Sequence, residues 1–133
     1  MSVKQLQEQC ARVPFFRFLD FSILEAEENG ILASMVQSDR HIGNPVIGAF
    51  HGGITASFME GIASVLVSRN LDIKHPKPIN LTIDYMRPAL AGTLYARAAI
   101  SRSGRRMASL ETYAWQDNES KPVAKGRFHF LLV

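Results

Sequence analysis

Residues 51–70 read HGGITASFMEGIASVLVSRN, and this stretch decides the fold. A helix over residues 53–70 would carry apolar side chains on most of its circumference, which indicates a helix buried against a sheet and not one lying half in water. Two glycines precede it, and Glu60 is the only residue between His51 and Ser68 with a full formal charge. We therefore expect this helix at the centre of a domain.

Strand-like patterns lie on both sides of the helix. Before it, residues 18–25 and 31–37 have the pattern of strands, and Glu28-Asn29-Gly30 supplies the turn of a hairpin. After it, four more strands with short turns are expected, over residues 79–86, 93–101, 107–116 and 123–132. This order predicts an α+β domain, the hotdog fold, in which a curved antiparallel β-sheet wraps around one long central α-helix.

The remaining stretches carry weaker patterns. Residues 2–12 have apolar side chains at helical spacing, which predicts a short amphipathic helix that Pro14 ends. Residues 39–50 form the longest stretch without a regular pattern. Apolar and polar side chains alternate over residues 79–86, so one face of that strand is expected to be apolar.

Composition narrows the class of protein. A chain of 133 residues that is 47% apolar supports one core, so we expect a single domain over residues 1–133. The single cysteine, Cys10, cannot form an intramolecular disulfide, and the chain has neither a signal-peptide stretch nor a membrane span; these features favour a cytoplasmic protein with no membrane partner. No Cys or His cluster suggests a metal. A net charge of +3 suits anionic small molecules as readily as nucleic acid.

Glu60 is the first candidate for chemistry, because its sequence neighbours are apolar. Burying a carboxylate among them is costly unless the carboxylate is paired or used. One interpretation is a structural glutamate that pairs with an arginine or faces water. The other is a partly desolvated carboxylate that acts on an electrophile as nucleophile or as general base for water.

The glycines at the start of the helix are the second candidate. Free backbone amides at a helix start can polarise a carbonyl, and we choose Gly52 as the donor; a tight turn with close helix packing is the structural alternative. Ser64 lies one turn after Glu60, where it can hold the carboxylate or a water, although most helix serines bond to the preceding turn. His51 and Asn44 can donate to a substrate or stabilise the loop.

The spacing of Gly52 and Glu60 bears on assembly. Eight positions along a helix separate their backbones by ~12 Å, whereas one reacting carbonyl must lie ~3 Å from both groups. If both act on one substrate, they come from different subunits, as two antiparallel helices across a twofold axis would allow. We therefore predict an obligate homodimer with shared active sites, and further association into a homotetramer.

The run NPVIGAFHGG over residues 44–53, followed by Glu60, resembles the signature of hotdog thioesterases related to the phenylacetate-degradation enzyme. Residues 78–89 resemble that family's strand ending in Tyr-Met-x-Pro-Ala, and the likeness extends from Phe18 to the end of the chain. Many relatives carry aspartate at the position of Glu60. Glutamate there resembles the glutamate-type 4-hydroxybenzoyl-CoA thioesterases and the menaquinone-pathway and enterobactin-pathway thioesterases.

This resemblance implies an acyl-CoA thioesterase that releases a free carboxylic acid and coenzyme A without a further cofactor. It implies Glu60 as nucleophile or base, the Gly52 amide on the thioester oxygen, His51 beside it and Ser64 supporting water. The loop over residues 44–51 is one residue longer than in some relatives, and Pro78 replaces a serine of certain aspartate-type members, so Asn44 is the weakest transfer.

The coenzyme A site is expected at the turn over residues 101–106. Arginine suits phosphate, and glycine allows close backbone approach. The candidates are Arg102, Gly104, Arg105 and Arg106, with Arg87 as a weaker one. The alternative for each arginine is a solvated basic hairpin tip.

Three other functions compete with hydrolysis. A non-catalytic acyl-CoA-binding hotdog protein, as sensor or subunit, would keep the fold without turnover. An enoyl-CoA hydratase would need an acid and a base where Ile42 and Ile47 stand. Single-stranded nucleic acid is not an expected partner, because the basic residues lack interleaved aromatics. The acyl group stays open between aromatic and medium-chain, with five apolar residues as possible lining: Phe15, Phe16, Phe18, Phe58 and Met59.

Overall fold

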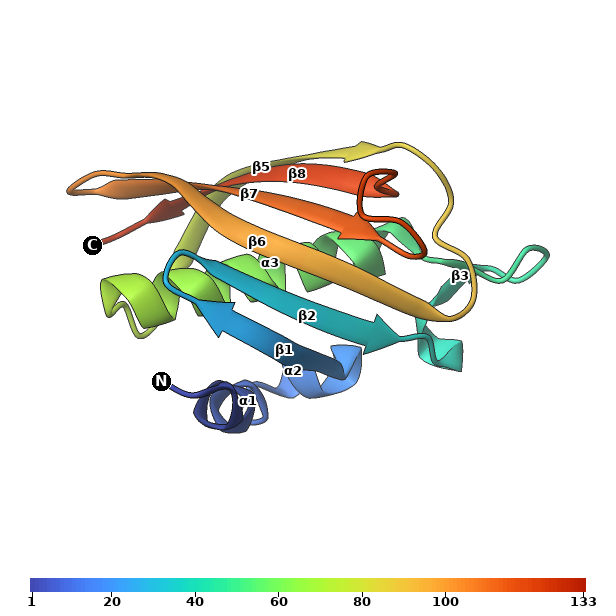
Figure 1. Cartoon of the computed structure of the whole chain (residues 1–133), viewed down its shortest axis with the longest axis horizontal. Helices are drawn as coiled ribbons and strands as arrows, with labels where there is room; N and C mark the ends of the chain where they lie inside the picture. The colour runs from blue at the N-terminus through green and yellow to red at the C-terminus, as the bar shows by residue number, and fades with distance from the viewer.

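One antiparallel sheet of six strands dominates the computed structural model, which describes residues 1–133 (Figure 1). The strand order is β1-β2-β6-β7-β8-β5, and every neighbouring pair is antiparallel. The strands are β1 (Phe21–Glu27), β2 (Gly30–Val36), β5 (Lys77–Tyr85), β6 (Thr93–Ser103), β7 (Met107–Trp115) and β8 (Ala124–Leu131). The hairpin predicted at Glu28-Asn29-Gly30 is present, since β1 pairs with β2.

The predicted central helix is α3 (Gly52–Leu71), and the sheet curves around it (Figure 1). Its sheet-facing side chains, including Phe58, Met59 and Ile62, are fully buried. Gly126 on β8 allows this close packing, because a Cβ there would lie 2.8 Å from the Ile83 side chain and 3.1 Å from that of Met59. The α+β hotdog arrangement predicted from the sequence is therefore confirmed. None of the helices is long and apolar enough to cross a membrane.

The N-terminal region differs from the prediction. The predicted first helix is present as α1 (Val3–Cys10), but Pro14 begins a second helix, α2 (Pro14–Leu19), and does not merely end the first. Proline suits the first turn of a helix, where an amide hydrogen has no partner to lose. The strand predicted over residues 18–25 accordingly starts only at Phe21, after Asp20 adopts a left-handed conformation at φ 60°.

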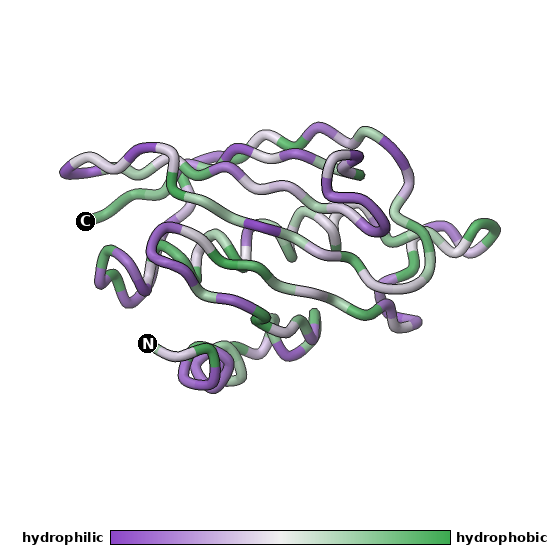
Figure 2. The backbone as a smooth tube through the Cα atoms, viewed as in Figure 1, coloured by the Kyte–Doolittle hydropathy of each residue, from purple (hydrophilic) through white to green (hydrophobic).

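The stretch over residues 39–50 is more regular than predicted. It contains the short 3-10 helix η1 (Asp39–His41) and a small hairpin of β3 (Ile42–Asn44) and β4 (Ala49–Phe50), which leads directly into α3. The tip of this hairpin is hydrophobic and projects from the body of the molecule (Figure 2). Val46 at the tip is 91% exposed.

The two edge strands of the sheet, β1 and β5, differ in how their outer backbone groups are covered. At the β1 edge, the side-chain amide of Gln7 from α1 makes two hydrogen bonds to the strand backbone. It accepts from the Ile23 amide at 2.7 Å and donates to the Phe21 carbonyl at 3.2 Å. At the other edge, β5 carries no such cover. Its alternating face is apolar as predicted, yet Leu81 is 41% exposed and Tyr85 56% exposed.

Candidate active site

The start of α3 leaves one backbone donor free. His51 is the N-cap residue, and its Nδ1 accepts from the Gly53 amide at 2.9 Å. The Ile54 and Thr55 amides both donate to the His51 carbonyl. The Gly52 amide makes no hydrogen bond within the chain. Of the amides in this first turn, Gly52 is therefore the one available to a ligand, as the sequence predicted for the donor.

A cavity of about 310 Å³ lies beside this free amide. It is formed where the start of α3 meets the end of β5 and the loop that follows, and Gly52, Tyr85 and Arg87 all line it. The Tyr85 hydroxyl donates to the Gly52 carbonyl at 2.7 Å, which fixes the peptide group at the helix start. Arg87, the weaker of the predicted coenzyme A contacts, thus lies at the same cavity as the predicted oxyanion donor.

Tyr85 was not among the residues predicted for the site. Alternation in the sequence placed it only on the apolar face of a strand. Its contact with Gly52 joins two residues 33 positions apart, and no local pattern encodes that proximity. Burial raises the pKa of the Tyr85 hydroxyl, so it stays protonated and able to donate at neutral pH.

Glu60 lies half-buried on α3 with no partner. The chain contains one ion pair, between Arg97 and Glu119, and no hydrogen bond involves the Glu60 side chain. Burial raises the pKa of its carboxyl above the ordinary value of 4.5, since desolvation disfavours the charged form. Glu60 is therefore not paired with an arginine, which was the structural alternative.

Ser64 and Asn44 both make local hydrogen bonds. The Ser64 hydroxyl donates to the Gly61 carbonyl at 2.9 Å, the bond to the preceding turn expected of a helix serine. The Asn44 side chain accepts from the Val46 amide at 3.1 Å and stabilises the hairpin turn. Ser64 lies one turn from Glu60 on the same helix, whereas no contact links Asn44 to either Gly52 or Glu60.

His41 contacts the residues that lead into α3. It was also absent from the predicted site. Its carbonyl accepts from the His51 amide at 2.7 Å, and its ring stacks on Phe50 with centroids 5.9 Å apart. Its Nδ1 accepts from the Ser38 amide at 3.1 Å, while its Nε2 is buried without a partner. Burial lowers the pKa of this imidazole below 6.5, which keeps the ring neutral.

The predicted basic turn lies far from Gly52 within one chain. The residues Arg102, Gly104, Arg105 and Arg106 are exposed at the tip of the β6–β7 hairpin, which the Gly104 amide closes by donating to the Met107 carbonyl at 2.9 Å. This hydrophilic tip lies at the end of the molecule where α3 finishes, opposite the end where α3 begins (Figures 1 and 2). A single chain therefore does not bring the basic turn and the free amide together.

The same holds for the two main candidates. Gly52 and Glu60 lie on one continuous helix, α3, so their backbones are separated by ~12 Å, as the spacing predicted. Each chain has a donor and a carboxylate, but the two groups of one chain are too far apart to act on the same carbonyl.

Comparison with known proteins shows the family of the chain. A sequence model described as the Thioesterase superfamily matches residues 47–123, a stretch that includes Gly52, Glu60 and Arg87. No curated protein matches the chain by sequence.

Solved structures agree with this assignment. Zebrafish thioesterase superfamily member 2 is 26% identical, with a TM-score of 0.83, and the alignment covers 98% of this chain and 96% of that one. A phenylacetic acid degradation-related protein from Ralstonia eutropha is 25% identical, with a TM-score of 0.81 and coverage of 95% and 98%. A Haemophilus influenzae thioesterase, 23% identical with a TM-score of 0.88 and coverage of 100% and 91%, shares the fold. The chain belongs to the thioesterase superfamily.

Proposed function

We propose that this protein is an acyl-CoA thioesterase of the glutamate type, which hydrolyses a thioester to a carboxylic acid and coenzyme A. The observation that carries the proposal is the state of Glu60: a half-buried carboxylate with no ion pair and no hydrogen bond, on the helix whose second candidate group, the Gly52 amide, is also unused. Two unsatisfied groups of opposite character suit a substrate that has both an electrophilic carbon and a carbonyl oxygen.

The reaction needs few groups. As general base, Glu60 takes a proton from water while the hydroxide attacks the thioester carbon, and the Gly52 amide bonds the oxygen that becomes negative. Collapse of the tetrahedral intermediate breaks the carbon–sulfur bond, and the coenzyme A thiolate takes up a proton as it leaves. As nucleophile, Glu60 would instead attack the thioester carbon and expel the coenzyme A thiolate, and water would then cleave the resulting mixed anhydride to the acid and free Glu60. Both routes use the same two residues.

The proposal includes a homodimer, because one chain separates its two groups. Small side chains surround Glu60 on the side of α3 turned away from the sheet, at Gly53, Ser57 and Ser64. Small residues let two helices approach closely. An antiparallel pair of α3 helices would bring Gly52 of one chain toward Glu60 of its partner. The uncovered apolar face of β5 supplies further surface for such contact. Pairing of two dimers into a homotetramer remains part of the proposal.

The same antiparallel arrangement accounts for the position of the basic turn. The hairpin tip with Arg102, Arg105 and Arg106 lies at the end of its own chain opposite Gly52 (Figure 1). In an antiparallel pair, the tip of one chain lies at the end where the partner's α3 begins. Arg87 already lines the cavity beside Gly52. We therefore propose that arginines of two subunits bind the phosphates of coenzyme A.

A panel of acyl-CoAs, assayed with a thiol reagent, tests this function on wild type, Glu60→Gln and Glu60→Asp. Removing the base or nucleophile should reduce kcat by about 10²–10⁴-fold on the best substrate. The shorter carboxylate of Glu60→Asp should retain part of the activity. Far-ultraviolet circular dichroism confirms that each variant is folded.

Two results would contradict the proposal. Full turnover by Glu60→Gln would remove this residue from the chemistry. Tight binding of acyl-CoA by wild type with no release of thiol would identify the protein as a non-catalytic acyl-CoA-binding member of the fold.

A further inference from the structure

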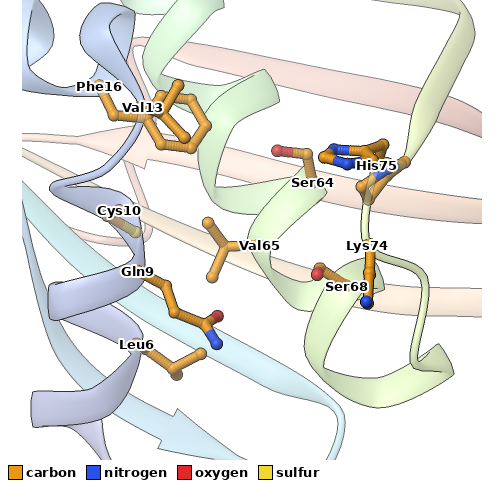
Figure 3. Close-up of a pocket in the computed structure, with 11 residues that line it drawn as sticks. Leu6, Gln9, Cys10, Val13, Phe16, Ser64, Val65, Ser68, Lys74 and His75 are labelled. Atoms are coloured by element: carbon orange, nitrogen blue, oxygen red, sulfur yellow. The ribbon is translucent and has the colours of Figure 1, made fainter.

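A second cavity lies on the side of α3 that faces away from the sheet (Figure 3). It measures about 300 Å³ and is enclosed by α1, α2, the second half of α3 and the loop after α3. Its lining residues are Leu6, Gln9, Cys10, Val13, Phe16, Ser64, Val65, Ser68, Lys74, His75 and Pro76. None of the residues at the Gly52 cavity contributes to it.

One side of the cavity lining is apolar and the other is polar. Leu6, Cys10, Val13 and Phe16 from the N-terminal helices form an apolar wall, joined by Val65 of α3. Serines of α3 and the segment around His75 form the opposite side (Figure 3). Lys74 and His75 are exposed, so the polar side is where the cavity opens. The apolar depth under α1 and the polar opening suit a ligand with a hydrophobic tail.

One end of the cavity lies one helical turn from Glu60. Ser64, which lines it, follows Glu60 by one helical turn. Phe16, also in the lining, packs on Gly61, where a Cβ would lie 3.2 Å from the Phe16 ring. From Ser64 the cavity follows α3 to Ser68, which is ~6 Å further from Glu60 along the helix axis. An acyl group whose carbonyl lies at Glu60 would therefore reach this space by extending along α3 by one helical turn, ~6 Å.

We propose that this cavity binds the acyl chain, and that the preferred substrates are thioesters of unbranched aliphatic acids of medium length. The proposal rests on the proposed thioesterase function and assigns its substrate class. A volume of about 300 Å³ holds roughly ten non-hydrogen atoms at about 30 Å³ each. The lining residues run along α1 from Leu6 to Cys10 and along α3 from Ser64 to Ser68, and a lining extended in this way suits a chain better than a ring.

Most of the apolar residues that the sequence suggested as acyl lining do not lie at this cavity. Of the five apolar residues that the sequence suggested as acyl lining, Phe16 alone lines the cavity. Phe58 and Met59 point into the sheet core, and Phe15 and Phe18 stack on each other at the surface with centroids 5.9 Å apart. The small residues at positions 64 and 68 leave the volume open, so larger side chains there should fill it.

The first test is the dependence of kcat/KM on acyl length, measured with acetyl-, butyryl-, octanoyl-, decanoyl-, palmitoyl- and phenylacetyl-CoA. Each added methylene should raise kcat/KM by about fourfold until the cavity is full, after which the gain should stop. Ser68→Leu should stop the gain about three carbons earlier, because the larger side chain occupies the far end. Ser22→Leu, the same substitution on the exposed strand β1, should leave the profile as in wild type.

The second test does not depend on turnover. Cys10 is the only thiol, is buried, and lines the cavity, so its rate of labelling by a small maleimide reports occupancy. In Glu60→Gln, decanoate should slow labelling at least several-fold, whereas butyrate and adenosine diphosphate, which has phosphates but no thiol to consume the maleimide, should not. Palmitate is too long to fit fully and should protect no better than decanoate.

The outcomes separate the two proposals. If phenylacetyl-CoA is the best substrate, or if Ser68→Leu keeps the wild-type profile while turnover still depends on Glu60, the acyl assignment is overturned and the thioesterase function stands. If no acyl-CoA is hydrolysed, the function fails, and protection of Cys10 by decanoate alone then decides whether the cavity binds a chain. Unchanged labelling with decanoate present counts against the cavity in either case.

Discussion

The Glu60 carboxylate has a desolvation cost that no interaction in the fold offsets. It is partly desolvated, and no cation or hydrogen-bond donor of the chain compensates the charge. Most glutamates avoid this situation by facing water. The sequence indicated the anomaly, because a single charge stood in an apolar helix. It left open whether an arginine neutralises that charge, since pairing depends on residues far away in the chain.

The first prediction concerns stability. The pKa of Glu60 is raised in the folded state above 4.5, so stability is lost as the pH rises from 4.5 through the folded-state pKa. Glutamine cannot ionise. Glu60→Gln should therefore be more stable than wild type at pH 7, by roughly 0.5–1 kcal/mol, because solvent screens a half-exposed carboxylate. At a pH below 4.5 the two proteins should unfold alike.

Thermal unfolding followed by circular dichroism at the two pH values gives the measurement. Glu8→Gln, on the exposed face of α1, is the matched control and should show no such difference. Lower stability of Glu60→Gln at pH 7 would mean that the carboxylate is held by a favourable interaction. The same raised pKa predicts that kcat/KM falls on the acidic side at a pH above 4.5, because the protonated carboxyl is not a base.

Helices and strands were predictable to the extent that their patterns are local. The position of α3 and the positions of the strands along the chain followed from periodicity and turn residues. The helix that begins at Pro14 was not predicted, because a proline is common both after the end of one helix and in the first turn of the next. The exposure of β5 was not predictable, since an apolar strand face does not show from the sequence how much of it other elements cover.

The second prediction concerns the first turn of α3. Gly52→Pro removes the free amide hydrogen, while proline suits the first position of a helix. His51 has φ −61° and ψ 133°, a conformation that the residue before a proline favours. We expect kcat to fall by about 10²–10³-fold with little change in Tm.

Gly52→Ala is the matched variant. It retains the amide, and its Cβ would lie 3.4 Å from the Tyr85 ring, an ordinary contact. It should lose far less activity than the proline variant. Equal losses in both variants would show that the amide has no special role, and steady-state kinetics on the best acyl-CoA decides between these outcomes.

The arrangement of the complete chain separates groups that the chemistry needs together. The contact of Tyr85 with Gly52 and the opposite placement of the basic hairpin follow from sheet order, which places β5 next to β8 and the β6–β7 tip beyond the end of α3. Sequence patterns gave each candidate group but not their mutual positions. The spacing along one helix was the exception, because helix geometry fixes it without any tertiary information.

The third prediction tests whether subunits share sites. Co-expressed Gly52→Pro and Glu60→Gln chains form mixed dimers in which one site combines two intact residues and the other combines two altered ones. Random mixing should restore about a quarter of wild-type activity, since half of the dimers are mixed and each has one working site. Activity that stays at the level of the separate variants would indicate a site within one chain.

Gln7 has a consequence for how many copies can join. Its side chain bonds the Phe21 carbonyl and the Ile23 amide at the β1 edge of the sheet, while no side chain bonds the outer backbone of β5 in this way. Strand addition is therefore open on one side only. Two copies that meet through their β5 edges leave only their β1 edges at the outside, where Gln7 obstructs pairing, so the sheet does not grow beyond two chains by strand addition. A substitution such as Gln7→Ala would expose the second edge and remove that obstruction.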